Sequence, residues 1–226
     1  MTKDSLPILY TFRRCPYAMR GRMALLVSGQ SFEWREILLR DKPAQMLEAS
    51  AKGTVPTLVL PNGAVIDESL DVMLWALTMN DPEGWLPINA MDRAVTYELI
   101  ERNDGPFKGH LDRYKYAARY DGVDGLEHRS AGFETIVDLD KRLAEQPFLA
   151  GETMGLADYA IFPFIRQFRV ADREWFDAQD IPHVHKWLQA AMASPLFEAI
   201  MVKRKPWKDT YGNEDHVPVI YPRDSA

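Results

Sequence analysis

The stretch LPILYTFRRCPYAMRGRMALLVSG, residues 6–29, decides the fold. Its first part, Leu6 to Phe12, is a short apolar run, which predicts a buried strand. After a polar turn, apolar side chains recur at the spacing of one helix face until Gly29 closes the helix. The residues on that face are Met19, Met23, Leu26 and Val27. The stretch therefore predicts a strand, a turn and a helix.

The alternation of strand and helix continues to about residue 80. The expected elements, in chain order, are a strand from Phe32 to Leu39, a helix from Lys42 to Ser50, strands from Thr57 to Leu60 and from Ala64 to Ile66, and a helix that follows Asp67-Glu68-Ser69. The turn Pro61-Asn62-Gly63 joins the last two strands as a hairpin. The order βαβαββα predicts an α/β domain over residues 1–80.

From residue 81 onward the pattern changes to helices alone. Residues 81–91 are rich in turn formers and predict a linker, and residues 92–226 predict an all-helical domain without a strand. A long helix is expected from Asp92 toward Tyr120, bent at Gly105-Pro106 because proline removes a backbone donor. Three further apolar helix faces begin at Phe133, Ala157 and Val184. The predicted fold class is therefore α/β plus all-α.

Composition excludes several classes of function. The 226-residue chain has a formal net charge of −6, so no broad basic surface for nucleic acid is expected. No stretch approaches the roughly 20 apolar residues of a membrane span, and no leader peptide is recognisable, so we expect a cytoplasmic protein without membrane contact. The single cysteine rules out an intrachain disulfide and a Cys-rich zinc site. The five histidines lack the spacing of a helical metal site, so no metal is expected.

Cys15 is the candidate reactive group. It lies in Arg13-Arg14-Cys15-Pro16, between the predicted strand and helix. A thiol in the first turn of a helix lies near unpaired backbone N–H groups and the positive end of the helix dipole, which lower its pKa and favour the thiolate. The alternative is that a lone cysteine is a small core residue, but a doubly basic turn is a poor place to bury an inert thiol. For Arg20 and Arg22, one turn on, a solvated helix face is the preferred interpretation.

Two other segments indicate a ligand site. Gly53-Thr54-Val55-Pro56 precedes a short strand, and a cis bond before Pro56 would expose backbone groups for an extended peptide, whereas an ordinary trans loop proline is the alternative. Glu68 and Ser69 begin a helix, where the amides and the hydroxyl suit a carboxylate and the acid suits an ammonium. A plain helix cap is the alternative there. A free α-amino acid end offers both of the required groups.

Together these features resemble the cytosolic glutathione transferase superfamily. The resemblance rests on Cys15-Pro16-Tyr17 after a strand, on Thr54-Val55-Pro56, on Glu68-Ser69 and on the helical second half. Because Ala18 replaces the second cysteine of a glutaredoxin-type motif, the sequence is similar to the omega-like, cysteine-type branch. Leu156-Ala157-Asp158 is similar to the family's helix-capping motif, although glycine precedes it where the family usually has Ser or Thr. The implied fold is a thioredoxin-like domain followed by an all-helical glutathione transferase domain.

The resemblance also assigns roles to individual residues, with glutathione as co-substrate. Cys15 is implied as the catalytic nucleophile. The implied glutathione contacts are Tyr17 at the thiol, Lys42 at the glycyl carboxylate, Val55 at the cysteinyl backbone, Pro56 as the cis-proline, and Glu68 with Ser69 at the γ-glutamyl end.

A small electrophilic or disulfide compound is the expected second substrate. Tyr114, Tyr116 and Trp207 are candidate walls of its pocket, and a core or subunit-contact role is the alternative for each of them. The family likeness alone implies a homodimer.

The implied reaction is glutathione-dependent thiol transfer. Cys15 attacks a glutathionylated or oxidised substrate, becomes glutathionylated and is released by a second glutathione, which comes from solution because the chain has no second cysteine. Deglutathionylation and dehydroascorbate-type reduction are expected, with weak conjugation. The rival interpretation is a non-catalytic protein that uses the same fold to dock a protein partner. A thioredoxin-type disulfide oxidoreductase is disfavoured by the missing second cysteine.

Overall fold

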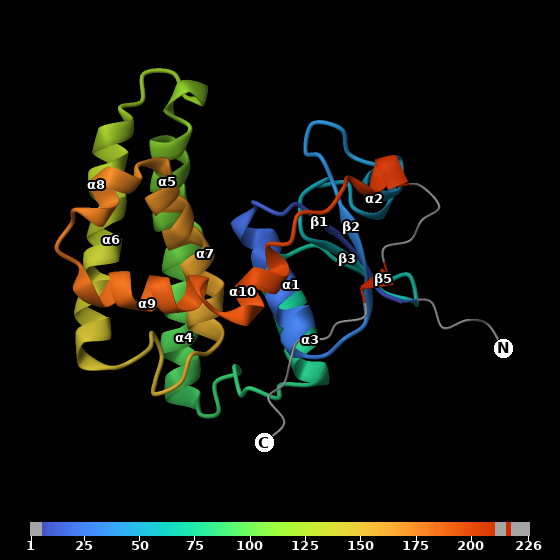
Figure 1. The fold of residues 1–226 in the computed structure, drawn as a ribbon, viewed down its shortest axis with the longest axis horizontal. Helices are drawn as coiled ribbons and strands as arrows, with labels where there is room; N and C mark the ends of the chain where they lie inside the picture. Colours follow the sequence, from blue (N-terminus) through green and yellow to red (C-terminus); the bar gives the residue numbers. More distant parts are fainter. Residues whose placement is uncertain (1–5, 211–215, 218–226) are drawn as a thin grey trace. The chain divides into compact units, whose positions relative to one another are not determined.

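The computed structural model describes residues 6–210 and 216–217, and the chain forms two compact units (Figure 1). The first unit combines Met1–Glu83 with Ser194–Ala226, and the second unit is Gly84–Ala193. The chain therefore leaves the first unit after its α/β segment and returns to it near the C-terminus. Within the described ranges, no helix is both long enough and apolar enough to cross a bilayer.

A mixed sheet forms the base of the first unit. Its strands are β1 (Ile8–Thr11), β2 (Phe32–Glu36), β3 (Thr57–Val59), β4 (Val65–Ile66) and β5 (His216–Val217). They lie in the order β4-β3-β1-β2-β5, so β1 is central, parallel to β2 and antiparallel to β3. Leu9 of β1 is paired with Trp34 on one side and with Leu58 on the other, and all three are buried. This pairing fixes the end of β1, from which the turn that carries Cys15 begins.

Helix α1 is buried along its whole length. The helices of the first unit are α1 (Pro16–Val27), α2 (Ala44–Ala49), α3 (Ser69–Met79), α10 (Pro195–Ile200) and the short 3₁₀ turn η3 (Trp207–Thr210). α1 packs against α3 and α10, and only Tyr17 among its residues is not buried. Gly21 permits this close packing, because a Cβ there would lie 3.1 Å from Val72 Cγ1 and 3.4 Å from Pro56 Cβ. Polar side chains on α1 must therefore find partners inside the protein.

The second unit is helical. Its elements are α4 (Ala90–Arg102), the π-helical turn η1 (Asn103–Phe107), α5 (Lys108–Lys115), the 3₁₀ turn η2 (Ala117–Arg119), α6 (Gly125–Glu145), α7 (Leu156–Ala171), α8 (Arg173–Asp177) and α9 (Pro182–Met192). η1 contains Gly105 and Pro106, so the regular α-helical hydrogen bonding changes to a π-helical turn at the position where the bend was predicted. Phe168 of α7 is fully buried and contacts the rings of Phe107 and Tyr114, at centroid distances of 5.6 and 4.9 Å. An aromatic core thus joins α5 to α7.

A buried carboxylate fixes the start of α7. Asp158 is fully buried, and it accepts hydrogen bonds from Leu149 N–H at 2.9 Å, Gly155 N–H at 3.0 Å and Trp187 Nε1–H at 2.8 Å. Burial raises the pKa of this carboxyl, while the three donors lower it. The Asp158 half of the expected capping box is therefore present, and Gly155 has no side chain to supply the other half. A Cβ on Gly155 would lie 3.3 Å from the carbonyl oxygen of Trp85, so a larger residue here would need a small shift of that backbone.

The predicted fold class is confirmed, an α/β thioredoxin-like part with a small mixed sheet and a helical part. The strands β1 to β4 and helix α2 are shorter than predicted by one to a few residues at their ends, whereas α4 begins at Ala90, two residues before the predicted start at Asp92. Within the described residues, five short elements were not predicted: β5, α8, α10 and the 3₁₀ turns η2 and η3. The expectation of no strand in residues 92–226 is wrong, because β5 pairs antiparallel with β2. A strand of two residues has too few side chains to show an alternating pattern.

Candidate functional site

Cys15 is the N-cap of α1, as predicted. Its backbone is extended, Pro16 occupies the first helical position, and the carbonyl of Cys15 accepts the first helical hydrogen bond, from Met19 N–H at 3.0 Å. The N–H of Cys15 donates to the carbonyl of Phe12 at 3.0 Å, which closes the turn after β1. The thiol is thus held at the positive end of a 12-residue helix.

The thiol faces the turn that precedes β3. Cys15 Sγ lies 3.8 Å from the carbonyl oxygen of Val55, and the Val55–Pro56 peptide bond is cis. Cys15 is half-buried, at the edge of an apolar cluster that includes Tyr10 and Met46. The sulfur is therefore neither fully enclosed nor fully exposed. The sequence predicts that the Cys15 turn and the Val55-Pro56 turn belong to one site, and in the structure the two turns are in contact.

Arg22 supports the turn from inside the protein. Its guanidinium is fully buried and donates to Thr11 Oγ1 at 2.5 Å, to the carbonyl of Phe12 at 3.1 Å and to the carbonyl of Arg13 at 2.7 Å. Burial lowers the pKa of Arg22 to about 10, and the charges of Glu36 and Cys15 oppose that shift, so the guanidinium is positive at neutral pH. The preferred interpretation of Arg22 as a solvated residue is wrong, because α1 has no solvated face on that side.

Glu36 fixes the same turn from β2. One of its carboxylate oxygens accepts from the backbone N–H of Arg13 at 2.6 Å, and the other accepts from Trp34 Nε1–H at 3.2 Å. Glu36 is buried, so both bonds form away from bulk water. The turn that carries Cys15 is therefore held by one buried cation and one buried anion, a combination that leaves little freedom to its backbone.

Lys42 lies beside the cis-proline turn. Gly53 begins that turn with a φ of +57°, in the left-handed region that favours glycine, and a Cβ there would lie 3.4 Å from Lys42 Nζ. The structure thus places the Lys42 ammonium at the turn that ends in Val55 and Pro56. An ammonium in this position can bind a carboxylate that lies beside the turn.

Ser69 is tied to α1 by a second buried arginine. Arg20 is fully buried and donates from Nη1 to Ser69 Oγ at 3.2 Å, and its guanidinium lies 5.4 Å from the ring centroid of Tyr17. Arg20 was also expected on a solvated face, and this expectation is wrong for the same reason as for Arg22. Because Ser69 is the first residue of α3, the arginine adds positive charge behind a helix N-terminus.

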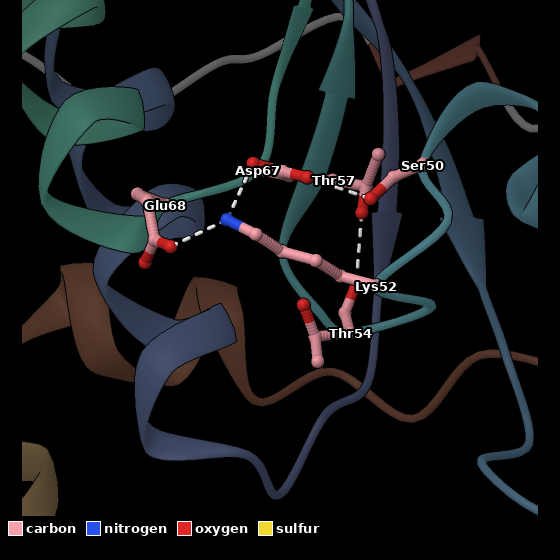
Figure 2. A network of polar contacts seen from close by, with 6 residues as sticks. All are labelled: Ser50, Lys52, Thr54, Thr57, Asp67 and Glu68. Atoms are coloured by element: carbon pink, nitrogen blue, oxygen red, sulfur yellow. Dashed lines mark hydrogen bonds and ion pairs between the residues drawn. The ribbon is translucent and has the colours of Figure 1, made fainter.

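Glu68 is paired with a lysine that sequence analysis did not single out. Lys52 Nζ lies 2.6 Å from Glu68 Oε1 and 3.1 Å from Asp67 Oδ1, and Ser50 Oγ donates to Asp67 Oδ2 at 2.6 Å (Figure 2). The hydrogen bond from Ser50 and the ammonium of Lys52 lower the pKa of Asp67, while Glu68 and Asp67 raise the pKa of Lys52. In the described structure the two acids therefore already hold a cation.

The candidate walls of the second-substrate pocket are in different surroundings. Tyr114 packs on Phe168 in the core of the second unit, which matches its alternative role as a core residue, and burial raises the pKa of its hydroxyl. Tyr116 lies between Lys115 and Arg119, with Arg119 Cζ 4.2 Å from its ring centroid. Trp207 belongs to the first unit. Its ring is 4.1 Å from Arg35 Cζ and makes an edge contact with Tyr10 at a centroid distance of 6.2 Å.

Two histidines that are distant in sequence lie together in the second unit. His110 Nδ1 of α5 and His128 Nδ1 of α6 are 2.9 Å apart. Burial, the neighbouring His128 and Arg113 lower the pKa of His110, and Glu134 raises it. Across the described residues, no group of three or more His, Cys, Asp or Glu side chains has the geometry to hold a metal ion.

Sequence reasoning missed three polar residues that shape the site: Arg22, Glu36 and Lys52. For Arg22 a signal was available, because α1 has apolar residues on nearly every side and leaves no room for a charged face. For Glu36 and Lys52 no local signal exists. Their partners are 23 and 16 positions away in the chain, so only the tertiary fold brings them together.

Two family models match the chain. The model described as "Glutathione S-transferase, N-terminal domain" matches residues 9–83, and "Glutathione S-transferase, C-terminal domain" matches residues 98–190. Together they cover most of the chain and correspond to the α/β and the helical segments described above.

Curated relatives are similar at 22 to 27% identity. Pyrimidodiazepine synthase of Drosophila melanogaster is 27% identical over 89% of this chain and 83% of its own length. Glutathione S-transferase omega-1 of Rattus norvegicus is 24% identical over the same shares. Glutathione S-transferase L1 of Arabidopsis thaliana is 26% identical over 82% of this chain and 78% of its own.

Solved structures share the fold. A glutathione transferase family member from Pseudomonas fluorescens, crystallised with two glutathione molecules bound, superimposes with a TM-score of 0.76 at 18% identity, covering 89% of this chain and 94% of its own. A glutathione S-transferase from Methylobacillus flagellatus with bound glutathione has the same TM-score at 16% identity, covering 86% and 98%. At these identities the likeness concerns the fold.

Proposed function

We propose that this chain, which belongs to the glutathione S-transferase family and is a glutathione transferase, works by a cysteine-based thiol-transfer cycle. The observation that carries the proposal is the position of Cys15. Its half-buried sulfur is at the N-terminus of α1, 3.8 Å from the Val55 carbonyl. The helix N-terminus and the buried charge of Arg22 both favour a thiolate there.

The proposed cycle has two disulfide exchanges. The Cys15 thiolate attacks the glutathione sulfur of a mixed disulfide, the old S–S bond breaks, and the substrate leaves as a thiolate that takes a proton from water. The thiolate of a second glutathione then attacks the glutathione sulfur on Cys15. Oxidised glutathione departs, and Cys15 is again a thiolate. Each turnover thus reduces one glutathione mixed disulfide, consumes one reduced glutathione from solution and releases one oxidised glutathione.

The sequence has no second cysteine to complete the cycle internally. Ala18 stands three positions after Cys15, where a resolving thiol would be. The enzyme cannot store oxidising equivalents as an intrachain disulfide, so the second thiol must come from solution. Deglutathionylation and dehydroascorbate-type reduction are therefore the proposed activities. Conjugation should be weak, because a cysteine that captures glutathione as a disulfide does not present it as a free thiolate.

We assign the tripeptide to groups that converge in the first unit. The backbone of Val55 beside cis-Pro56 pairs with the cysteinyl unit, and Lys42, at the adjacent Gly53, reaches the glycyl carboxylate. The γ-glutamyl end binds at the start of α3, to Ser69 and Glu68. Tyr17 lines the thiol. Tyr116 and Trp207 remain the proposed contacts of a small disulfide or electrophilic substrate, in a cytoplasmic homodimer.

Two candidates compete with this assignment to the omega-like, cysteine-type branch. A docking protein with the same fold would need no ordered cysteine turn, whereas here Arg22 and Glu36 fix that turn from both sides. A conjugating transferase would use a Tyr or Ser hydroxyl beside the glutathione sulfur, whereas the residue at the N-terminus of α1 is Cys15. The similarity to omega-1 enzymes favours the cysteine type.

The test is the Cys15→Ser variant. We expect its turnover of a glutathione mixed disulfide to fall by at least about 100-fold, since a serine hydroxyl is a far weaker nucleophile at neutral pH. Retention on immobilised glutathione should persist, because every other contact remains. Unchanged turnover in the variant would refute the thiol cycle. If the wild-type protein is not retained on immobilised glutathione, the interpretation as a docking protein is favoured.

A further inference from the structure

The ammonium of Lys52 occupies an anionic pair at the start of α3. It lies 2.6 Å from Glu68 Oε1 and 3.1 Å from Asp67 Oδ1, and Figure 2 shows the lysine extended between the two acids. The other carboxylate oxygen of Asp67, Oδ2, accepts a hydrogen bond from Ser50 Oγ at 2.6 Å, which holds the side chain of Asp67 in place. The lysine comes from the segment between α2 and the cis-proline turn, and the acids come from the segment between β4 and α3. This contact thus joins two loops at the same end of the β3–β4 pair.

A site for the opposite charge lies next to it. Ser69, the residue after Glu68, is buried, and its hydroxyl receives a hydrogen bond from the buried Arg20 at 3.2 Å. Backbone N–H groups of the first turn of α3 add partial positive charge at the same place. A carboxylate is favoured at Ser69 and an ammonium at Glu68. An α-amino acid end carries a carboxylate and an ammonium on one carbon, so it can bind to Ser69 and to Glu68 at the same time.

Lys52 has the chemistry of the ligand group expected there. Its ammonium has one positive charge and three N–H donors, as does an α-ammonium. Two ammonium groups at the same carboxylate oxygen repel each other, so an α-ammonium at Glu68 Oε1 competes with Lys52 for that oxygen. The pair is also easy to open: the side chains of Lys52 and Glu68 are 50% and 66% exposed, and exposed ion pairs contribute little to stability.

We propose that Lys52 is a specificity-determining residue of the γ-glutamyl subsite, where it acts as a built-in competitor of the ligand's α-ammonium. In the free protein Lys52 is paired with both Asp67 and Glu68 and compensates one of their two negative charges. When a γ-glutamyl ligand binds, its α-ammonium displaces Lys52 from Glu68. A ligand without the amino group leaves Lys52 in place and meets no bare carboxylate. Lys52 thus narrows the difference in affinity between ligands with and without an α-amino group. The inference rests on the proposed placement of glutathione.

The experiment measures the affinity of two peptides by titration calorimetry. One is S-methylglutathione, whose blocked sulfur prevents disulfide exchange with Cys15, and the other is its analogue without the α-amino group. In Lys52→Met, we expect S-methylglutathione to bind about 2- to 5-fold more tightly, the range expected for release of an exposed ion pair. The deaminated analogue should bind equally well or more weakly, since it now meets uncompensated acids.

Two further variants serve as controls. Lys52→Arg keeps the competing charge and should bind both peptides within about twofold of the wild-type protein. Lys141→Met removes a comparable exposed ion pair in the second unit, with Asp138 at 3.2 Å, and should change neither affinity. These controls separate competition at Glu68 from a general effect of net charge.

Each outcome decides between interpretations. If Lys52→Met lowers the affinity for both peptides, Lys52 helps to bind the ligand and does not compete with its α-ammonium. If neither affinity changes, the ion pair has no influence on the subsite. Either result overturns the proposal about Lys52 and leaves the thiol cycle intact. If the wild-type protein binds neither peptide, the placement of glutathione itself is wrong, and the inference about Lys52 fails with it.

Discussion

The sulfur of Cys15 lies 3.8 Å from the backbone carbonyl oxygen of Val55, a residue 40 positions later in the chain. This contact joins the N-terminus of α1 to the turn that contains the cis peptide bond. A peptide that pairs with the backbone of Val55 would place its own side chain beside the thiol. The relationship therefore connects a reactive group with a docking edge, the two elements that a thiol-transfer enzyme for a cysteine-containing peptide requires.

Arg22 should control the ionisation of Cys15. Replacing Arg22 with Met removes a buried positive charge and the hydrogen bonds that it donates to Thr11 Oγ1 and to the carbonyl of Arg13, whereas the carbonyl of Phe12 keeps the N–H of Cys15. We expect the pH at which alkylation of Cys15 by iodoacetamide is half-maximal to move up by about one unit. The same change should destabilise the fold by about 2–4 kcal/mol, because buried acceptors are left unpaired. Because Cys15 is the single cysteine, the alkylation rate needs no correction for other thiols.

Two comparisons keep the Arg22 experiment interpretable. Arg22→Lys retains the charge without the planar guanidinium, so the fold should be less affected and the alkylation profile should move less. Arg14→Gln removes an exposed charge next to Cys15 in sequence and should shift the profile little, since exposed charges are screened. An unchanged profile in folded Arg22→Met and Arg22→Lys would show that the buried guanidinium has only a structural role.

Asp158 should stabilise the second unit. Asp158→Ala leaves the backbone N–H groups of Leu149 and Gly155 and the indole N–H of Trp187 without an acceptor. We expect a loss of about 3–5 kcal/mol in the free energy of unfolding, measured with urea. Asp158→Asn keeps one acceptor oxygen of similar geometry and should lose less. Equal stability of the Ala variant and the wild-type protein would contradict this account of the helix start.

The pair His110 and His128 should make stability depend on pH. The folded protein holds the pKa of His110 below the value of about 6.5 that an unfolded chain has, owing to burial, His128 and Arg113, with Glu134 in opposition. As pH falls through 6.5, the unfolded chain binds a proton before the folded protein does. The free energy of unfolding should therefore decrease between pH 7 and pH 5.5.

Variants at single histidines test that dependence. His110→Gln should unfold with a smaller change in free energy between pH 7 and pH 5.5 than the wild-type protein does. His183→Gln, which alters an exposed histidine of α9, should retain the wild-type dependence. If His110→Gln and the wild-type protein show the same pH dependence, His110 does not cause the loss of stability between pH 7 and pH 5.5.

The sequence was sufficient where function depends on local pattern. Cys15 at a strand-to-helix turn, the irregular helical turn at Gly105-Pro106 and the order of the first elements all follow from short-range periodicity and turn formers, and the structure has them. The same reasoning located the turn at Val55-Pro56. These features depend on neighbours within a few positions of the chain, which a single sequence displays.

Features that depend on tertiary contacts were not accessible from the pattern. Arg20 and Arg22 were expected in solvent because Arg usually is exposed, but α1 packs against both α3 and α10 and buries them. Lys52 gave no signal, since its partners lie 15 and 16 positions away across a hairpin. The return of the chain to the sheet at β5 depends on pairing with β2, and a segment of two residues is too short to show a strand pattern in the sequence.

The central claim, that Cys15 captures glutathione, is tested most directly by intact-mass measurement after incubation with oxidised glutathione at neutral pH. We predict that the folded wild-type protein gains the mass of one glutathionyl group and loses it again on addition of reduced glutathione, while Cys15→Ser gains nothing. The contradicting result is a folded protein that gains no mass while the urea-unfolded chain does, because the thiol would then be shielded in the native state.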